Sequence, residues 1–244
     1  LLVRAGKASS AGLIDIIKHY ANETNDAVWD TVAMTLAELR KFVETDDAAE
    51  TKLRMLSRQI ASTEYARLGF DETPGEPLAD TKLRPSIVGM MLYGEDEAVI
   101  AEALKRFDIS QLASVPSDMR SLIIGAAVRH SGDESLSSNL MDVYTSTPSA
   151  DLREAIISGL TSTRSEAVAA DMLARCMDGA IVRPQDVAHW FVYFIRNRHT
   201  RTAAWQWLQD NWSWIEHTFA GDKSYDEFPR YAAMGLMTGE QLAQ

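Results

Sequence analysis

The sequence predicts an all-α protein built as a superhelical array of short antiparallel helix pairs. Apolar residues recur every three to four positions along most of the 244 residues, which is the period of an amphipathic helix. No stretch sustains the two-residue alternation of a half-buried strand. A short motif that begins with arginine also recurs at a spacing suited to stacked helix pairs. Together these features place the chain in the all-α class.

The apolar stripes give the expected helices and their ends. Asn25 precedes the first clear stripe and suits an N-cap, and Gly69 follows the second as a stop signal. Residues 211–213 are expected to divide the last stripe into two helices. The stripes consist of Val28, Val32, Leu36, Leu39 and Val43; Leu53, Leu56 and Ile60; Val187, Phe191, Phe194 and Ile195; and Trp205, Leu208, Trp212, Ile215 and Phe219.

The repeated motif is an arginine, two residues, two apolar residues and then a small residue. It begins at Arg84, Arg120 and Arg153, and Arg183 keeps part of it, at intervals of 36, 33 and 30 residues. A helix pair with its turns has about this length, so the period indicates a HEAT/armadillo-like α-solenoid. The small residue would let two helix backbones approach closely.

The four arginines are candidate contact residues because they recur at one phase of the repeat. In one hypothesis each pairs with a carboxylate or a helix-end carbonyl of the neighbouring repeat. In the other they form a positive row that attracts the carboxylate end of a peptide. Two of them, Arg84 and Arg183, are followed directly by a proline. Proline fits a first helical turn, so these helices are expected to start late, near Pro85 and Pro184.

The sequence shows no clear domain boundary, so we expect a single domain that covers residues 1–244. The clearest gap between stripes is residues 71–80, with Pro74, Gly75 and Pro77, and it predicts a loop that is either mobile or packed as a flap. No stretch has the composition of a long flexible linker. Because the chain begins with Leu1, we expect it to be a piece of a longer polypeptide.

Charge and composition exclude several classes of function. The formal net charge of −11 argues against nucleic-acid binding, which depends on Lys and Arg. No apolar run is long enough to span a membrane, so no membrane partner is expected. The only cysteine, Cys176, lies at helical spacing from Val168 and Met172 and is predicted to be a core residue. The presence of only one cysteine favours a cytoplasmic location.

No catalytic or metal-binding motif is present. The sequence lacks H-E-x-x-H, G-x-S-x-G and the phosphate-binding glycine loops. No two of its five histidines stand three or four residues apart, so no single helix offers two imidazoles to one metal. His189, beside Trp190, is interpreted as a packed and hydrogen-bonded side chain. We therefore assign no catalytic residue, metal ligand or cofactor to this chain.

Aromatic residues gather between positions 190 and 214. We interpret them as the core of the last helix pairs, with a binding face as the alternative. Trp207 and Trp214 lie off the main apolar stripe, so they are the candidates for contact with another surface. The cluster contains Trp190, Phe191, Tyr193, Phe194, Trp205, Trp207, Trp212 and Trp214.

Seven short segments are distinctive together by their order and spacing, although no single one is diagnostic and residues 1–24 are the least distinctive. The segments are Leu68-Gly69-Phe70 with Leu83-Arg84; Tyr93-Gly94-Glu95-Asp96 with Arg106-Phe107; Val115-Pro116-Ser117-Asp118-Met119-Arg120; Val182-Arg183-Pro184-Gln185-Asp186; Ala204-Trp205; Asn211-Trp212; and Thr238-x-Glu240-Gln241-Leu242. In these segments the chain resembles the helical C-terminal domain of the aminopeptidase N family of zinc metallopeptidases. That family includes the peptide-trimming enzymes of the endoplasmic reticulum.

The resemblance implies a noncatalytic domain that folds over the catalytic domain of the same polypeptide and shapes its peptide-access chamber. In that family the zinc-binding helix and the substrate-amine motif G-x-M-E-N belong to preceding domains, and neither occurs here. Zinc is accordingly expected in the parent enzyme, with a peptide substrate as a further partner. The alternative is a free-standing helical-repeat scaffold that binds a separate protein.

Overall fold

The computed structural model describes residues 7, 10–21, 23–133, 135–221 and 223–235, and these are all-helical with connecting turns. The resembling segment at 238–242 lies outside the described residues. The chain forms two compact units, residues 1–103 and residues 104–244. The all-α prediction is confirmed. The prediction of a single domain stays a prediction, because one repeat domain can contain two compact units.

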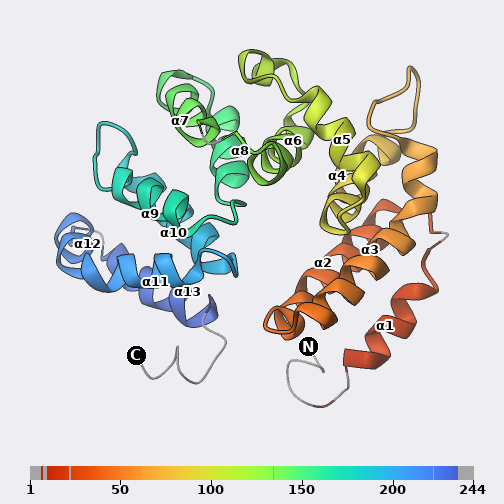
Figure 1. Ribbon diagram of the computed structural model, residues 1–244, viewed down its shortest axis with the longest axis horizontal. Coiled ribbons are helices and arrows are strands. Elements are labelled where there is room, and N and C mark those ends of the chain that lie inside the picture. Colours follow the sequence, from red (N-terminus) through yellow and green to blue (C-terminus); the bar gives the residue numbers. More distant parts are fainter. Residues whose placement is uncertain (1–6, 8–9, 22, 134, 222, 236–244) are drawn as a thin grey trace. The chain divides into compact units, whose positions relative to one another are not determined.

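The first unit is a bundle of long helices (Figure 1). Its central helices α2, α3 and α4 contact one another, and α1 contacts α2. Their apolar faces meet around Trp29, Ile60 and Ile87, all of them buried. Two hydrogen bonds between helices add to this packing, from Ser57 to the carbonyl of Met90 and from Ser86 to Asp30. The helices are α1 (Ser10–Lys18), α2 (Asp26–Val43), α3 (Asp47–Leu68) and α4 (Leu78–Tyr93); α5 (Glu97–Arg106) crosses the boundary between the units.

The second unit stacks its helices in two layers. Helix α8 contacts both α6 and α10, and α7 and α9 lie to one side of these three helices (Figure 1). The unit ends with α11, which contacts α9, and α13, which contacts α10. This stacking of alternate helices is consistent with the predicted superhelical array of helix pairs. The elements are η1 (Ile109–Ser114), α6 (Ser117–His130), α7 (Leu136–Ser146), α8 (Ala150–Leu160), α9 (Glu166–Arg175), α10 (Pro184–Arg196), α11 (Arg201–Asp210), α12 (Trp212–Thr218), η2 (Ser224–Asp226) and α13 (Glu227–Gly235).

Glycines at the contact between α6 and α8 bring the two backbones close together. A Cβ atom placed on Gly159 would lie 2.3 Å from Cγ2 of Ile124, and one on Gly125 would lie 3.1 Å from Oγ of Ser162. The predicted role of the small repeat residue is thus confirmed at Gly125. In the next repeat the close contact is made by Gly159, one position after the expected Ser158.

Most of the predicted helix ends are confirmed. Oδ1 of Asn25 accepts hydrogen bonds from two backbone N–H groups in the first turn of α2. Gly69 ends α3 with a φ of 61°, which favours glycine. Asn211 separates α11 from α12. The expected late start at Pro85 is wrong, because α4 begins at Leu78 and continues through Pro85, whereas α10 does begin at Pro184.

Candidate functional site

Two of the repeated arginines, Arg120 and Arg153, make the same contact. Each lies in the first turn of its helix, and its guanidinium reaches back to the carbonyls that end the preceding helix. Nε and Nη2 of Arg120 donate to the carbonyl oxygens of Val115 and Ala113, both at 2.8 Å. Nε and Nη2 of Arg153 donate to Tyr144 and Thr147 at 3.4 and 2.6 Å. Helix-end carbonyls have no partner within their own helix, so a cation that donates to them is favourable.

Arg84 makes a related contact and also binds a carboxylate. Its Nε and Nη2 atoms approach the carbonyl oxygen of Leu68, the last residue of α3, at 3.4 Å. Its Nη1 and Nη2 atoms donate to the two carboxylate oxygens of Glu76 at 2.8 and 2.6 Å. The side chain is almost fully buried. A buried cation needs such partners, because burial without them would be very costly.

Arg183 does not share this contact, and an arginine that the sequence analysis missed does. Arg183 precedes the first residue of α10, is half exposed, and pairs with Asp186 of its own first turn. Arg201, the first residue of α11, is buried and donates from Nε to the carbonyl oxygen of Ile195, near the end of α10, at 3.1 Å. Ala204 and Trp205 follow it at the spacing of the apolar pair, but Gln206 stands where the motif has a small residue, so the full motif did not identify it.

Replacing Arg153 by methionine is expected to lower stability without affecting peptide binding. The carbonyl oxygens of Tyr144 and Thr147 would lose their charged donor, at a cost of about 1–3 kcal/mol. Thermal unfolding of the protein and steady-state kinetics of the full-length enzyme measure the two effects. Arg183→Met is the matched control and should change stability by less than about 0.5 kcal/mol. A raised KM with an unchanged melting temperature would instead support the row of peptide-binding arginines.

The aromatic cluster forms the core of the last helix pairs, as predicted. Trp190, Phe191 and Phe194 are fully buried on α10. Phe191 packs against Trp207 and Phe228 with tilted rings whose centroids lie 6.0 and 5.3 Å away. Aromatic contacts of this kind add to the stabilisation that burial provides. The end of the second unit is therefore held together mainly by aromatic packing.

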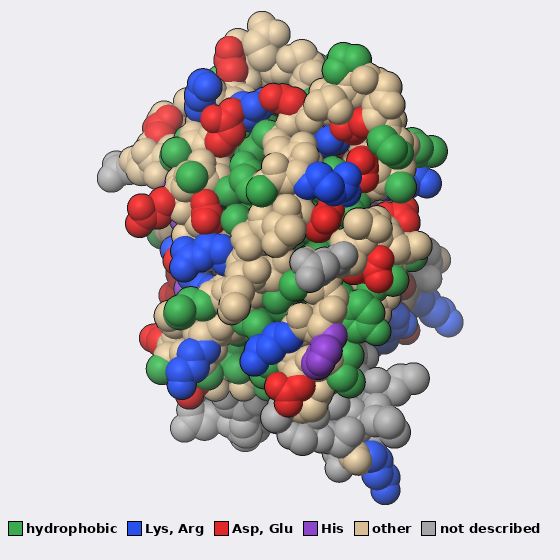
Figure 2. Space-filling model, turned by 90° about the vertical axis from the view of Figure 1, so that its right-hand side faces the viewer, with side chains coloured by type: hydrophobic (Ala, Val, Ile, Leu, Met, Phe, Trp, Pro, Cys, Tyr) green, Lys and Arg blue, Asp and Glu red, His purple; other side chains and the backbone are tan. Residues whose placement is uncertain are grey.

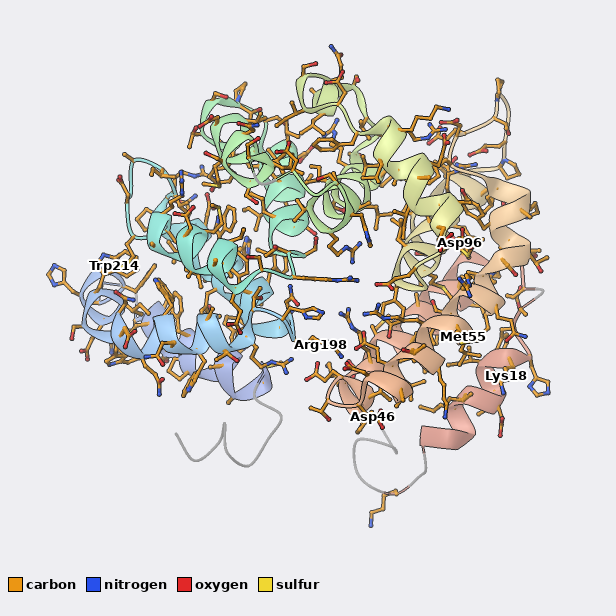
Figure 3. The ribbon with its side chains drawn as sticks, viewed as in Figure 1. Lys18, Asp46, Met55, Asp96, Arg198 and Trp214 are labelled. Atoms are coloured by element: carbon orange, nitrogen blue, oxygen red, sulfur yellow. The ribbon has the colours of Figure 1, made fainter. Side chains whose placement is uncertain are left out.

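The two candidate contact tryptophans differ in exposure. Trp207 is 7% exposed, so the expectation that it offers an apolar surface is wrong. Its indole packs between Phe191 and Trp214 because α11 is covered on more than one side. Trp214 lies on α12 and is partly buried (Figure 3). Of the two, only Trp214 keeps a surface that another domain could contact.

Exposed large apolar side chains are concentrated in the first unit. Met55 on α3, labelled in Figure 3, is one of them. On the face shown in Figure 2, apolar side chains are separated by charged and polar ones, and acidic and basic groups are interspersed. Isolated exposed apolar residues are common on protein surfaces. Among the described residues the exposed set is Ile16, Tyr20, Met34, Phe42, Met55, Leu78 and Met234.

Several titratable side chains form ion pairs or are buried. Two nearly buried acids pair with arginines on the same helix: Glu50 with Arg54 and Glu64 with Arg67. Cys176 is buried as predicted, and burial raises the pKa of its thiol. Among the residues that the structure describes, no three His, Cys, Asp or Glu side chains gather where they could hold a metal ion.

His189 is not the packed side chain that we predicted. It is 60% exposed, lies 3.6 Å from a carboxylate oxygen of Glu154, and stacks on the ring of Tyr193. Consecutive side chains on a helix point about 100° apart. Because the Trp190 side chain points into the core, that of His189 points toward solvent. Tyr193 also donates a hydrogen bond to Glu154, which links α10 to α8.

None of the helices in the described part of the chain is both long and apolar enough to cross a membrane.

Comparison with known proteins shows the family. The model of the ERAP1-like C-terminal domain matches residues 1–244. Aminopeptidase N of Lactococcus lactis subsp. cremoris is 29% identical over 246 residues, covering 100% of this chain and 29% of that protein. For aminopeptidase N of Lactobacillus helveticus the identity is 27% over 246 residues, with the same coverage. Glutamyl aminopeptidase of Mus musculus is 24% identical over 226 residues, covering 92% of this chain and 24% of that protein. The chain thus spans less than a third of these relatives, and it belongs to the family of ERAP1-like C-terminal domains.

Proposed function

We propose that this chain is the noncatalytic C-terminal domain of a zinc aminopeptidase that removes N-terminal residues from peptides. The match of the family model over the whole chain carries this proposal. The relatives are named aminopeptidases, and more than two thirds of each lies outside the matched part. The chemistry is accordingly assigned to the rest of the polypeptide, where the zinc would be bound.

The role proposed for the domain is to cover the catalytic domain and to shape the chamber through which peptides enter. A stack of helix pairs offers a broad surface for another domain, and a cover over a reaction site restricts access and excludes water. Trp214 and Arg183 are proposed as contact residues because both remain partly exposed. Arg84, Arg120 and Arg153 already bind groups within this chain. The cytoplasmic location stays a prediction.

The isolated chain is expected to be inactive. It should not hydrolyse amino-acid anilides, and it should bind zinc only weakly, because no motif supplies closely spaced ligands or a site for the substrate amine. Anilide hydrolysis and the zinc content of tag-free protein are the measurements, with the full-length enzyme as the positive control. Stoichiometric zinc or measurable turnover in the isolated chain would refute the noncatalytic assignment.

A further inference from the structure

The loop between α3 and α4 has an exposed tip between two glycines. Residues 71–75 are exposed to solvent, whereas Phe70 just before them is buried. Gly69 and Gly75 have φ values of 61° and 81°, and a Cβ atom on either would meet no other atom within 4 Å. Backbone of this kind is permissive, and the tip buries almost no apolar surface. Apolar packing therefore does little to hold the tip in place.

Glu76 makes five hydrogen bonds through its carboxylate that help to hold the loop in its observed conformation. Its carboxylate accepts two hydrogen bonds from Arg84, at 2.8 and 2.6 Å. It also accepts one from the hydroxyl of Thr81 at 2.9 Å. From within the loop, the backbone N–H and the hydroxyl of Thr73 donate to it at 2.9 and 3.2 Å. The Glu76 carboxylate thus ties the tip of the loop to α4.

The arginine in this pair also contacts the end of α3. Arg84 approaches the last carbonyl oxygen of that helix, that of Leu68, while it holds Glu76. Its side chain is 3% exposed and that of Glu76 is 9% exposed, so the pair is shielded from solvent. Shielded pairs in bidentate geometry are among the stronger ion pairs. The contact with Arg84 also holds the pKa of the Glu76 carboxyl well below its usual range, so the pair remains charged at neutral pH.

The base of the loop has a separate cross-link. Nη1 and Nη2 of Arg67 on α3 donate to the two carboxylate oxygens of Asp80 in the first turn of α4, at 2.7 and 2.8 Å. Helices α3 and α4 are further joined by their apolar faces and by the hydrogen bond from Ser57 to Met90. These contacts do not involve residues 70–76, so the packing of α3 on α4 does not depend on the tip.

We propose that residues 71–76 form a strap with a closed and an open state, and that the ion pair between Glu76 and Arg84 is the latch that closes it. When this ion pair breaks, the tip can move by backbone rotation at Gly69 and Gly75, while α3 and α4 stay packed together. In the closed state the strap presents its exposed tip in one conformation, so a partner would meet a preorganised surface. This inference concerns the first unit alone and does not rest on the proposed function.

Amide hydrogen exchange of the intact protein, followed by mass spectrometry, tests the latch. In the native protein, peptides covering residues 70–77 should exchange more slowly than an unstructured chain. Glu76→Gln keeps the shape of the side chain but removes its charge. It should accelerate exchange of the Thr73 amide by roughly ten- to a hundredfold, since hydrogen bonds to charged groups contribute on this scale. Exchange in the helical cores of α3 and α4 should not change.

Two controls separate the latch from general loosening. Glu72→Gln removes an exposed charge from the same loop and should leave exchange of the Thr73 amide unchanged. Asp80→Asn breaks the other cross-link and should loosen the start of α4 without releasing the tip. The proposal is overturned if Glu76→Gln leaves exchange in the loop unchanged, or if the native loop already exchanges like an unstructured chain. Faster exchange throughout α3 and α4 in Glu76→Gln would also overturn it, because the pair would then support the whole bundle.

Discussion

Replacing Trp190 by alanine should lower the free energy of unfolding by about 3–5 kcal/mol, the range for truncating a large aromatic side chain in a core. Trp190 is fully buried on α10. Its ring meets that of Tyr144 edge-on, with centroids 5.6 Å apart, and lies 6.1 Å from that of Phe194. Alanine would leave a cavity where α7 meets α10, and the surrounding helices could only partly collapse into it.

Denaturant unfolding followed by circular dichroism at helical wavelengths measures this loss. Trp214→Ala is the matched control, because Trp214 is a partly buried tryptophan of the same unit. Its loss should be smaller, about 1–2 kcal/mol. Equal effects of the two substitutions would contradict the assignment of Trp190 to the core.

Local sequence signals predicted the helices and several of their ends correctly. The period of apolar residues identified the faces of α2 and α10, and Asn25 and Gly69 marked ends that depend on backbone geometry alone. Caps of this kind are local interactions, so they can be inferred from a few neighbouring residues. The break at Asn211 was predictable for the same reason.

Features that depend on tertiary packing were not predictable. The burial of Trp207 follows from helices that cover α11 on more than one side, whereas a single apolar stripe assumes one buried face. Arg201 takes the helix-capping contact expected of Arg183, because it stands where the chain turns back after α10. The partner of Arg84 is Glu76, which lies in a loop whose course no sequence period describes.

The four candidate arginines were inferred from their phase in the repeat, which states only that they occupy equivalent positions. Phase does not state whether a guanidinium points to solvent or to a helix end. In the structure Arg120 and Arg153 use theirs to bind the end of the preceding element. The repeat thus identified a recurring structural contact more clearly than it identified a binding surface.

Removal of this domain from the full-length enzyme should impair the enzyme without removing its metal. The truncated protein is expected to keep its zinc, because the sequence of this chain has no zinc-ligand motif. It should be less stable, because the surface that the domain is proposed to cover would be exposed to solvent. Its kcat/KM for short peptides should fall by on the order of tenfold or more, or its selectivity should be lost, because an open site neither positions the peptide nor excludes water.

The most direct test compares kcat/KM for peptides of several lengths, and for a folded protein substrate, between the intact enzyme and the enzyme without residues 1–244. Zinc content, measured in parallel, shows that the catalytic part has folded. We predict full zinc occupancy, together with lower kcat/KM on short peptides or weaker discrimination against the folded substrate. A truncated enzyme that equals the intact one in stability, in kcat/KM across peptide lengths and in discrimination against folded substrates would contradict the proposed covering role.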